Sequence, residues 1–209
     1  VMYLYPNNFT DELIDAFASL DKVCKYIDIP LQHASDRLLD SMNRYDTRAQ
    51  VEKLLHKLRT RVKDITIRTT FIVGFPGETD EDFAELKDFV EQQRFENAGV
   101  FQYSQEEGTV AGAMENQIAP EIKENRYHEL MALQAEISEE IHQEREGVEL
   151  DVLVEGFDED NLAYGRSTHE APDIDGTIFI ENAGNLQIGD MVRVRISQGF
   201  TYEMVGERI

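Results

Sequence analysis

The feature that most constrains the fold is the segment at residues 65–83, ITIRTTFIVGFPGETDEDF. It opens with a run rich in β-branched residues, 65–73, which is typical of a buried strand in a parallel sheet. Gly74 and Gly77 then mark a turn, and Thr79 stands where the N-cap of a helix with an acidic first turn is expected. The segment therefore predicts a strand, a glycine turn and a helix. In parallel α/β proteins, ligands bind at the carboxyl ends of the strands, where such a turn lies.

The same alternation runs through the first two thirds of the chain. Strand-like runs occur at 1–5, 23–29, 65–73 and 98–104. Helical patterns follow them, and a long helix is expected from Pro120 to about Arg145. This order predicts an α/β fold with parallel strands, and four strands are too few to close an eight-stranded barrel. We therefore expect an open, partial β/α barrel in residues 1–143, with Cys24 as a small buried residue inside its second strand.

The hydrophobic period changes from helical to two after Gly147. Residues 148–154 and 192–196 alternate, and short strand-like runs with glycine turns lie between them. Five short strands predict a small OB-like β barrel over residues 144–209, a class that commonly binds oligonucleotides. Residues 146–209, however, hold 14 acidic and 4 basic residues, a formal charge of −10. That charge argues against nucleic acid as the partner.

The whole chain is strongly acidic, with 20 Lys and Arg against 42 Asp and Glu, a formal net charge of −22. Such a field repels phosphate backbones and anionic membranes and attracts basic partners. No apolar run approaches the length of a membrane span, and no secretory signal pattern opens the chain, so a cytoplasmic protein is expected. Cys24 is the only cysteine, which predicts no disulfide, no metal site and no iron–sulfur cluster in this chain alone.

Five motifs occur in a fixed order along the chain. They are YIDIPLQH at 26–33, MNR at 42–44, RTTFIVGFPGET at 68–79, YSQEEGT at 103–109 and RYHELMALQ at 126–134. Together they resemble the radical S-adenosylmethionine methylthiotransferases, and residues 144–209 resemble the TRAM domain of that family. The resemblance covers essentially the whole chain. The family's cysteine triad is absent, so the chain is expected to be a fragment and inactive alone, with no catalytic residue of its own.

Within this family the chain resembles the branch that modifies a ribosomal protein. The sequence EEGT at 106–109, Thr70 in place of an aspartate and the acidic segment 170–176 are similar to that branch. The resemblance implies that the full enzyme adds a methylthio group to the β-carbon of an aspartate in the twelfth small-subunit ribosomal protein, a basic partner. Two alternatives stay open. One is a tRNA adenosine methylthiotransferase, which a basic barrel face would favour, and the other is a docking module without catalysis.

The resemblance also implies cofactors, namely S-adenosyl-L-methionine, with 4Fe-4S clusters in the full-length enzyme. Gln32 and Arg44 occupy positions where related enzymes hold the ribose and the carboxylate of S-adenosylmethionine. Further ribose and adenine contacts are implied for Thr70, Gly74, Phe75, Phe101 and Tyr103. From the residues alone, Phe101 could instead belong to the core, and Arg44 could pair with Asp40 or Asp46.

The acidic residues of the C-terminal barrel gather in two predicted loops. They are Asp158, Asp160, Glu170, Asp173 and Asp175. OB-like barrels bind with their loops and one face, so this pattern predicts a docking surface for a basic ribosomal protein. The alternative is a solvated acidic surface that only keeps the domain soluble.

Overall fold

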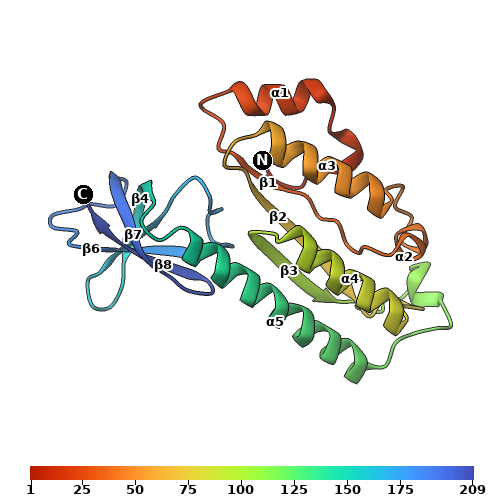
Figure 1. Cartoon of the computed structure of the whole chain (residues 1–209). Helices are drawn as coiled ribbons and strands as arrows, with labels where there is room; N and C mark the ends of the chain where they lie inside the picture. The colour runs from red at the N-terminus through yellow and green to blue at the C-terminus, as the bar shows by residue number, and fades with distance from the viewer. The chain divides into compact units, whose positions relative to one another are not determined.

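The computed structural model describes residues 1–209, and the chain divides into two compact units (Figure 1). The first comprises Val1–Val23 and Ile27–Gln134, and the second comprises Cys24–Tyr26 and Ala135–Ile209. No helix is both long enough and apolar enough to span a bilayer.

The first unit contains short helices and three strands. In chain order the elements are η1 (Pro6–Asn8), α1 (Asp11–Ser19), β1 (Tyr26–Asp28), α2 (Asp36–Ser41), α3 (Arg48–Arg61), β2 (Thr66–Val73), α4 (Asp80–Gln93), β3 (Asn97–Gln102), η2 (Ala111–Ala113) and the start of α5 (Pro120–Glu144). The strand order is β1-β2-β3, and β2 pairs with β3 in parallel from Arg68–Asn97 to Val73–Gln102. The predicted open, parallel β/α arrangement is confirmed.

The sheet is covered on the face that carries Phe71. This fully buried ring packs edge-on against Phe89 of α4, with ring centroids 6.4 Å apart, and lies 5.8 Å from Phe95. Along β2, buried residues alternate with partly exposed ones, so Thr70 and Ile72 lie on the opposite face. The two faces of the central strand therefore have different tasks, one packing on helices and one open to ligands.

The helix start predicted at Thr79 is present with its cap, and α3 begins in the same way. Thr47 accepts a hydrogen bond from the amide of Gln50 before α3, and Thr79 accepts one from the amide of Asp82 before α4. In both cases the side chain of the third helical residue accepts a hydrogen bond from the backbone amide of the cap residue, which completes a capping box. The second box fixes the end of the glycine turn that follows β2.

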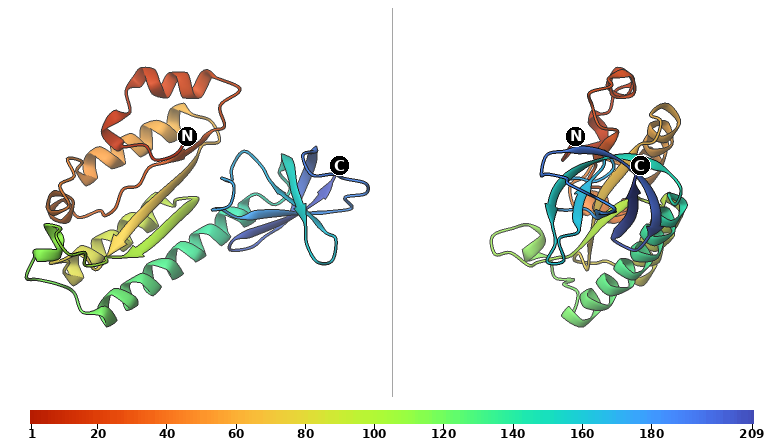
Figure 2. Two further views of the ribbon diagram at one scale, coloured as in Figure 1. Left: turned by 180° about the vertical axis from the view of Figure 1, so that it is seen from behind. Right: turned by 90° about the vertical axis from the view of Figure 1, so that its left-hand side faces the viewer.

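The second unit is built around a closed five-stranded barrel. Its strands are β4 (Glu149–Phe157), β5 (Ala163–Arg166), β6 (Thr177–Glu181), β7 (Met191–Gly199) and β8 (Glu203–Arg208), in the order β4-β5-β6-β8-β7. Figure 2 shows these strands at the C-terminal, blue end of the chain. Inward residues such as Val152, Ile178, Val194 and Met204 form one buried core. The predicted OB-like barrel is confirmed.

Three predictions at the N-terminal end are wrong. Residues 1–5 form no strand, because Tyr3 has a φ of 57°, although Leu4 donates a hydrogen bond to the carbonyl of Asp28 at 2.9 Å. The sheet accordingly has three strands instead of four. Cys24 is exposed, because β1 begins only at Tyr26 and leaves Cys24 in the preceding loop.

Candidate functional site

A pocket of about 710 Å³ opens at the carboxyl end of the three-stranded sheet. Its wall comes from the segment after β1, the end of α2 with the turn that follows, the end of β2, the segment after β3 and the start of η2. The volume falls within the roughly 300–1,000 Å³ of small-molecule sites. The pocket thus occupies the place where the strand-turn-helix pattern predicts a ligand.

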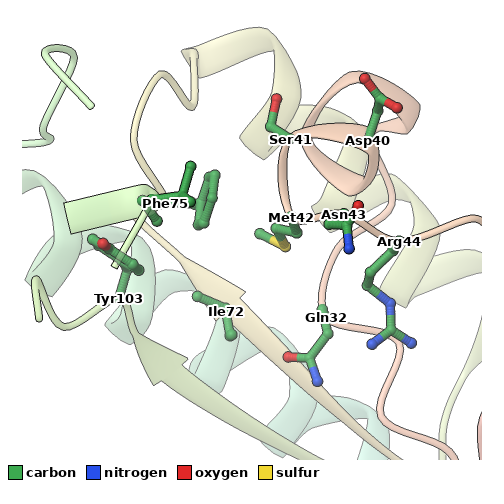
Figure 3. A pocket seen from close by; sticks show the side chains of 11 residues that line it. Gln32, Asp40, Ser41, Met42, Asn43, Arg44, Ile72, Phe75 and Tyr103 are labelled. Carbon is green, nitrogen blue, oxygen red and sulfur yellow. The ribbon is translucent and has the colours of Figure 1, made fainter. Parts of the chain in front are cut away.

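Four of the seven predicted cofactor residues line this pocket. Gln32 and Arg44 lie on one side and Phe75 and Tyr103 on the other, with Ile72 of β2 between them (Figure 3). Residues far apart in the sequence meet here because the carboxyl ends of neighbouring parallel strands share one edge of the sheet. Gln32 itself extends this edge, since its amide donates to the carbonyl of Thr70 at 2.8 Å.

The other three predicted cofactor residues lie outside the pocket lining. Thr70 is on the open face of β2, two residues before Ile72. Phe101 is 62 % exposed on β3, opposite Ile72 in the register, so the alternative that it belongs to the core is wrong. Gly74 is buried beneath the side chain of Lys123. Contact of these three with a cofactor stays a prediction.

Three buried polar atoms around the pocket have no hydrogen-bond partner in the protein. They are Oε1 of Gln32, Nε of Arg44 and the hydroxyl of Tyr103. Buried polar atoms are nearly always hydrogen-bonded in folded proteins. Gln32 also has a φ of 71°, an uncommon conformation that clusters at ligand sites. Together these features indicate a pocket shaped for a polar ligand.

Arg44 is held in place beside the pocket. Its Nη2 donates to the carbonyl of Pro30 at 2.8 Å, and its guanidinium lies 4.8 Å from the ring centroid of Tyr5. The contact with Asp46 is loose, at 4.0 Å, so this alternative pairing exists but uses little of the guanidinium. A side chain only 15 % exposed keeps its positive charge at the pocket wall, where it suits a carboxylate.

The opposite wall is aromatic. Phe75 and Tyr103 meet edge-on, with ring centroids 5.3 Å apart. Lys123 of α5 places its Nζ 5.0 Å from the centroid of the Tyr103 ring and donates to the carbonyl of the same residue at 2.9 Å. The two rings are therefore fixed from behind and present an apolar surface to the pocket.

A buried ion pair anchors the turn that carries Phe75, and the sequence analysis did not predict it. Oε2 of Glu78 accepts from the amides of Gly74 and Phe75, and Nη1 of Arg126 lies 3.2 Å from Oε1 of Glu78. The two side chains are 0 % and 7 % exposed. Burial raises the pKa of Glu78 to about 7, although Arg126 and the two amides oppose the shift. Both residues lie inside recognised motifs, but their 48-residue separation hid their contact.

A second buried cluster fixes the start of α2 against α4. Asp82 accepts from the hydroxyls of Ser35 and Thr79 and from Arg37. Burial alone would raise the pKa of Asp82, but these hydrogen bonds outweigh it and lower the pKa to about 2. His33 accepts from the amide of Ser35 at 3.0 Å, and burial lowers its pKa to about 4, so this histidine is neutral at physiological pH.

Models of known protein families match segments of both compact units. Residues 2–90 match the Radical SAM superfamily, and residues 147–209 match the TRAM domain. A ribosomal protein uS12 methylthiotransferase RimO from Desulforamulus reducens is 51 % identical over 209 residues, which is 99 % of this chain and 47 % of the relative. The RimO of Geobacter sulfurreducens is 46 % identical over 211 residues, covering 100 % of this chain and 47 % of the relative. The chain belongs to the RimO family of radical SAM proteins.

The chain spans about half the length of the curated RimO relatives it matches. Among solved structures, the radical SAM enzyme coproporphyrinogen III oxidase (HemN) from Escherichia coli aligns with a TM-score of 0.55 and 17 % identity. That alignment covers 65 % of this chain and 31 % of HemN. At this identity the likeness shows the fold alone, which is the radical SAM β/α fold.

The acidic residues predicted for docking on the TRAM barrel differ in their exposure to solvent. Asp158 and Asp160, in the loop after β4, and Asp173, in the loop after β5, are exposed. Asp175 is half-buried and accepts from the amide of Ala171 at 2.8 Å.

The prediction that Glu170 belongs to a docking surface is wrong. It is only 6 % exposed, so it is committed to the inside of the barrel unit and is unavailable for docking. Its Oε2 accepts from the amide and the hydroxyl of Ser167, each at 2.7 Å, and Arg145 lies 3.4 Å from its Oε1.

Three of the four arginines in the TRAM barrel strands form ion pairs, and the fourth, Arg208, donates to a backbone carbonyl. Arg166 binds Glu155 at 2.7 Å, and Arg208 donates to the carbonyl of Ala183 at 3.0 Å. The two outward-facing arginines of β7 pair with acidic residues of the neighbouring strand β4: Arg193 binds Asp151 at 3.1 Å and Arg195 binds Glu149 at 2.8 Å. This barrel therefore presents no basic face of the kind that neutralises phosphates.

The structure brings no three His, Cys, Asp or Glu side chains together as a metal site. A 4Fe-4S cluster requires thiolate ligands, and Cys24 is the only cysteine. The residues present therefore do not fit an iron–sulfur cluster, whereas the pocket with its unpartnered polar atoms does fit S-adenosylmethionine.

Proposed function

We propose that this chain forms the S-adenosylmethionine pocket and the substrate-docking barrel of a methylthiotransferase that modifies ribosomal protein uS12. The observation that carries the proposal is the pocket at the sheet edge, whose lining includes Gln32, Arg44 and Tyr103, each of which carries a buried polar atom without a hydrogen-bond partner. The names of the RimO relatives support the reaction and its substrate. The clusters that reduce the cofactor would be held by residues outside this sequence.

The pocket residues fit the parts of S-adenosylmethionine. When bound and reduced, this cofactor supplies the radical chemistry of the superfamily. Arg44 would hold the carboxylate through its charge, and Gln32 would accept a hydrogen bond from a ribose hydroxyl. The rings of Phe75 and Tyr103 would flank the adenine and exclude water from it. The role of this chain is thus to bind and orient the cofactor.

The direct test is to read the gene upstream of Val1 and to assay the protein that it encodes. A Cys-x-x-x-Cys-x-x-Cys motif is expected there, and the anaerobically reconstituted protein is expected to add a methylthio group to an aspartate of uS12, detected by mass spectrometry. If no cysteine motif precedes Val1, or if the reconstituted protein modifies tRNA and leaves uS12 unchanged, the proposed function is wrong.

Replacing Arg44 by Lys should weaken S-adenosylmethionine binding by about 1–3 kcal/mol, the scale of a charged hydrogen bond. Lysine keeps the charge but loses the planar fork that matches a carboxylate. The measurement is isothermal titration of the cluster-containing protein, with Arg48→Lys as control, because Arg48 pairs with Glu52 away from the pocket. Wild-type affinity in a folded Arg44→Lys protein would show that this side chain is only structural.

The acidic loops of the TRAM barrel support docking of a basic protein. Asp158, Asp160 and Asp173 are exposed, and three of the barrel's four arginines are ion-paired, so most of the unpaired charge is negative. Opposite charge speeds encounter with a basic partner such as uS12 and loses strength with salt. A tRNA-binding barrel would need the reverse arrangement, so the tRNA-modifying alternative is not favoured.

Neutralising Asp158 and Asp173 to Asn should slow association with uS12 and flatten its salt dependence, because fewer charges steer the encounter. Surface plasmon resonance between about 50 and 300 mM salt measures both quantities, over the range in which exposed charges become screened. The control is Asp21→Asn with Asp64→Asn, which makes the same change in net charge on exposed residues of the first unit. Equal effects of the two double variants would show that the acidic loops only keep the domain soluble. Tight binding of tRNA would instead favour the tRNA-modifying alternative.

A further inference from the structure

The backbone bonds that join β2 to β3 end where the aromatic wall of the pocket begins. The last pair in the register is Val73 with Gln102, and one further bond runs from the amide of Tyr103 to the carbonyl of Val73, at 2.9 Å. Phe75 lies two residues beyond Val73, in the glycine turn. The sheet alone therefore does not fix how the rings of Phe75 and Tyr103 stand relative to each other.

Lys123 of α5 spans the two strand ends from behind. Its stem lies against the glycine turn, because a Cβ built on Gly74 would overlap Cγ of Lys123 and would lie 3.0 Å from its Cδ. Its ammonium group reaches the other strand end, where it donates to the carbonyl of Tyr103 at 2.9 Å and lies 5.0 Å from the centroid of that ring. One side chain thus touches both segments that carry the aromatic wall.

The charge of Lys123 is used in an uncommon way. The chain holds 42 acidic residues against 20 Lys and Arg, yet this half-buried lysine binds a carbonyl and a ring and forms no ion pair. Arg126, one turn further along α5, instead pairs with Glu78 and Asp80. Taking a charge partly out of water without a counter-charge costs free energy, and proteins keep such arrangements chiefly at functional sites.

Helix α5 does not need Lys123 in order to pack on the first unit. Arg126 forms a buried ion pair there, Leu130 is fully buried, and Nε2 of Gln134 donates to the carbonyl of Phe95 at 2.9 Å. These contacts hold the helix over three turns beyond Lys123. The position of the lysine is therefore better explained by the pocket than by the docking of the helix.

We propose that Lys123 is a positioning residue for the cofactor pocket, which holds Tyr103 and the glycine turn so that the two rings form one wall for a planar, adenine-like group. The proposal rests on the function proposed above, since it concerns the same pocket. Lys123 does not line the pocket, so it acts through Tyr103 and the turn without touching the ligand. Binding sites depend on such support, because their side chains must be locked in place by packing and hydrogen bonds behind them.

The test compares two ligands by isothermal titration of the cluster-containing protein. S-adenosylhomocysteine carries both adenine and a carboxylate, whereas methylthioadenosine carries the adenine alone. Lys123→Met keeps most of the stem but loses the donor, so the affinity for both ligands should fall by the same factor, about fivefold to tenfold, the scale of one hydrogen bond. Arg44→Lys should weaken only S-adenosylhomocysteine, because methylthioadenosine has no carboxylate to lose.

Two further variants make the result specific to the site. Lys123→Arg restores a donor on a similar stem and should recover most of the affinity. Lys87→Met removes another lysine that lies over a ring, 5.2 Å from the centroid of Phe83 and outside the pocket lining, and should leave both affinities unchanged. Binding is measured well below the melting temperature of every variant, so that a loss of affinity reports the site and not the fold.

The outcomes separate this proposal from the proposed function. Wild-type affinities in Lys123→Met would overturn the positioning role. A loss confined to S-adenosylhomocysteine would also overturn it, because Lys123 would then act on the carboxylate end of the ligand. If the wild-type protein binds neither ligand, the cofactor pocket itself is refuted, and the role of Lys123 with it.

Discussion

Replacing Arg126 by Met is expected to lower the free energy of unfolding by about 1–3 kcal/mol at pH 8, because the buried carboxylate of Glu78 loses a partner and escapes part of the cost by taking up a proton. The Glu78 side chain is fully buried, and Arg126 lies 3.2 Å from it while also donating to the exposed carboxylate of Asp80 at 2.7 Å. Methionine preserves most of the volume, so the loss is electrostatic and not a cavity. Urea unfolding followed by circular dichroism measures it.

The effect of this substitution should depend on pH in a defined direction. Burial raises the pKa of Glu78 to about 7, above its ordinary value of 4.5, so the folded protein holds a proton that the unfolded chain has released. The free energy of unfolding therefore falls as pH rises from about 4.5 through the folded pKa of Glu78. Removing Arg126, which lowers the pKa of Glu78, raises that pKa further. The loss in Arg126→Met should therefore be small near pH 4.5 and largest at pH 8.

Two variants make this interpretation specific. Lys87 also packs over the ring of Phe83 and pairs with an acid, Glu129 at 2.9 Å, but both charges are exposed. Lys87→Met should therefore cost less than about 1 kcal/mol. Adding Glu78→Gln to Arg126→Met should restore most of the stability at pH 8, because the buried charge is then gone. A loss that is independent of pH, or one that Glu78→Gln does not relieve, would contradict the electrostatic origin.

Local sequence patterns predicted most of the fold because they act over a few residues. Thr47 and Thr79 are capping residues by chemistry, and the structure places both at helix starts. The period-two alternation after Gly147 predicted strands that close into a barrel, since one face of each must be buried. Both signals are contained in short windows and survive in the folded protein.

The wrong predictions depended on backbone conformation or on distant partners. Residues 1–5 have strand-like composition, but Tyr3 turns the chain with a positive φ that no residue type announced. Cys24 was expected inside a strand that in fact begins two residues later, at Tyr26. Glu170 looked like a surface acid, but it is buried because Arg145 and Ser167 fold around it. Residue composition alone determines none of these outcomes.

The candidate site was predictable in part. The resemblance to the methylthiotransferases implied Gln32, Arg44, Phe75 and Tyr103 as cofactor residues, and the structure places all four in the lining of one pocket. The support behind the site was not predictable. Lys123 contributes a side chain from α5, which begins well after the sheet is complete. Its contact with Tyr103 is a property of tertiary packing alone.

Gly74→Ala should be among the most damaging single substitutions in the first unit, because it combines two costs. Gly74 has a φ of 74°, and an alanine there pays about 1–2 kcal/mol for a left-handed backbone. A Cβ at this position would also overlap Cγ of Lys123, and overpacking of this kind typically costs about 1–3 kcal/mol. The free energy of unfolding should fall by roughly the sum of the two.

Two comparisons separate these costs. Gly77 has the same kind of backbone, with a φ of 81°, but the nearest atoms to its Cβ position are 3.8 Å away, so Gly77→Ala should show the conformational cost alone. In a Lys123→Ala background, Gly74→Ala should likewise fall to about 1–2 kcal/mol, because the obstacle is gone. In the protein that keeps Lys123, Gly74→Ala should also loosen the aromatic wall, because the displaced Lys123 no longer donates to the carbonyl of Tyr103. If Gly74→Ala costs the same with and without Lys123, that side chain is not what requires a glycine, and the left-handed backbone alone explains the position.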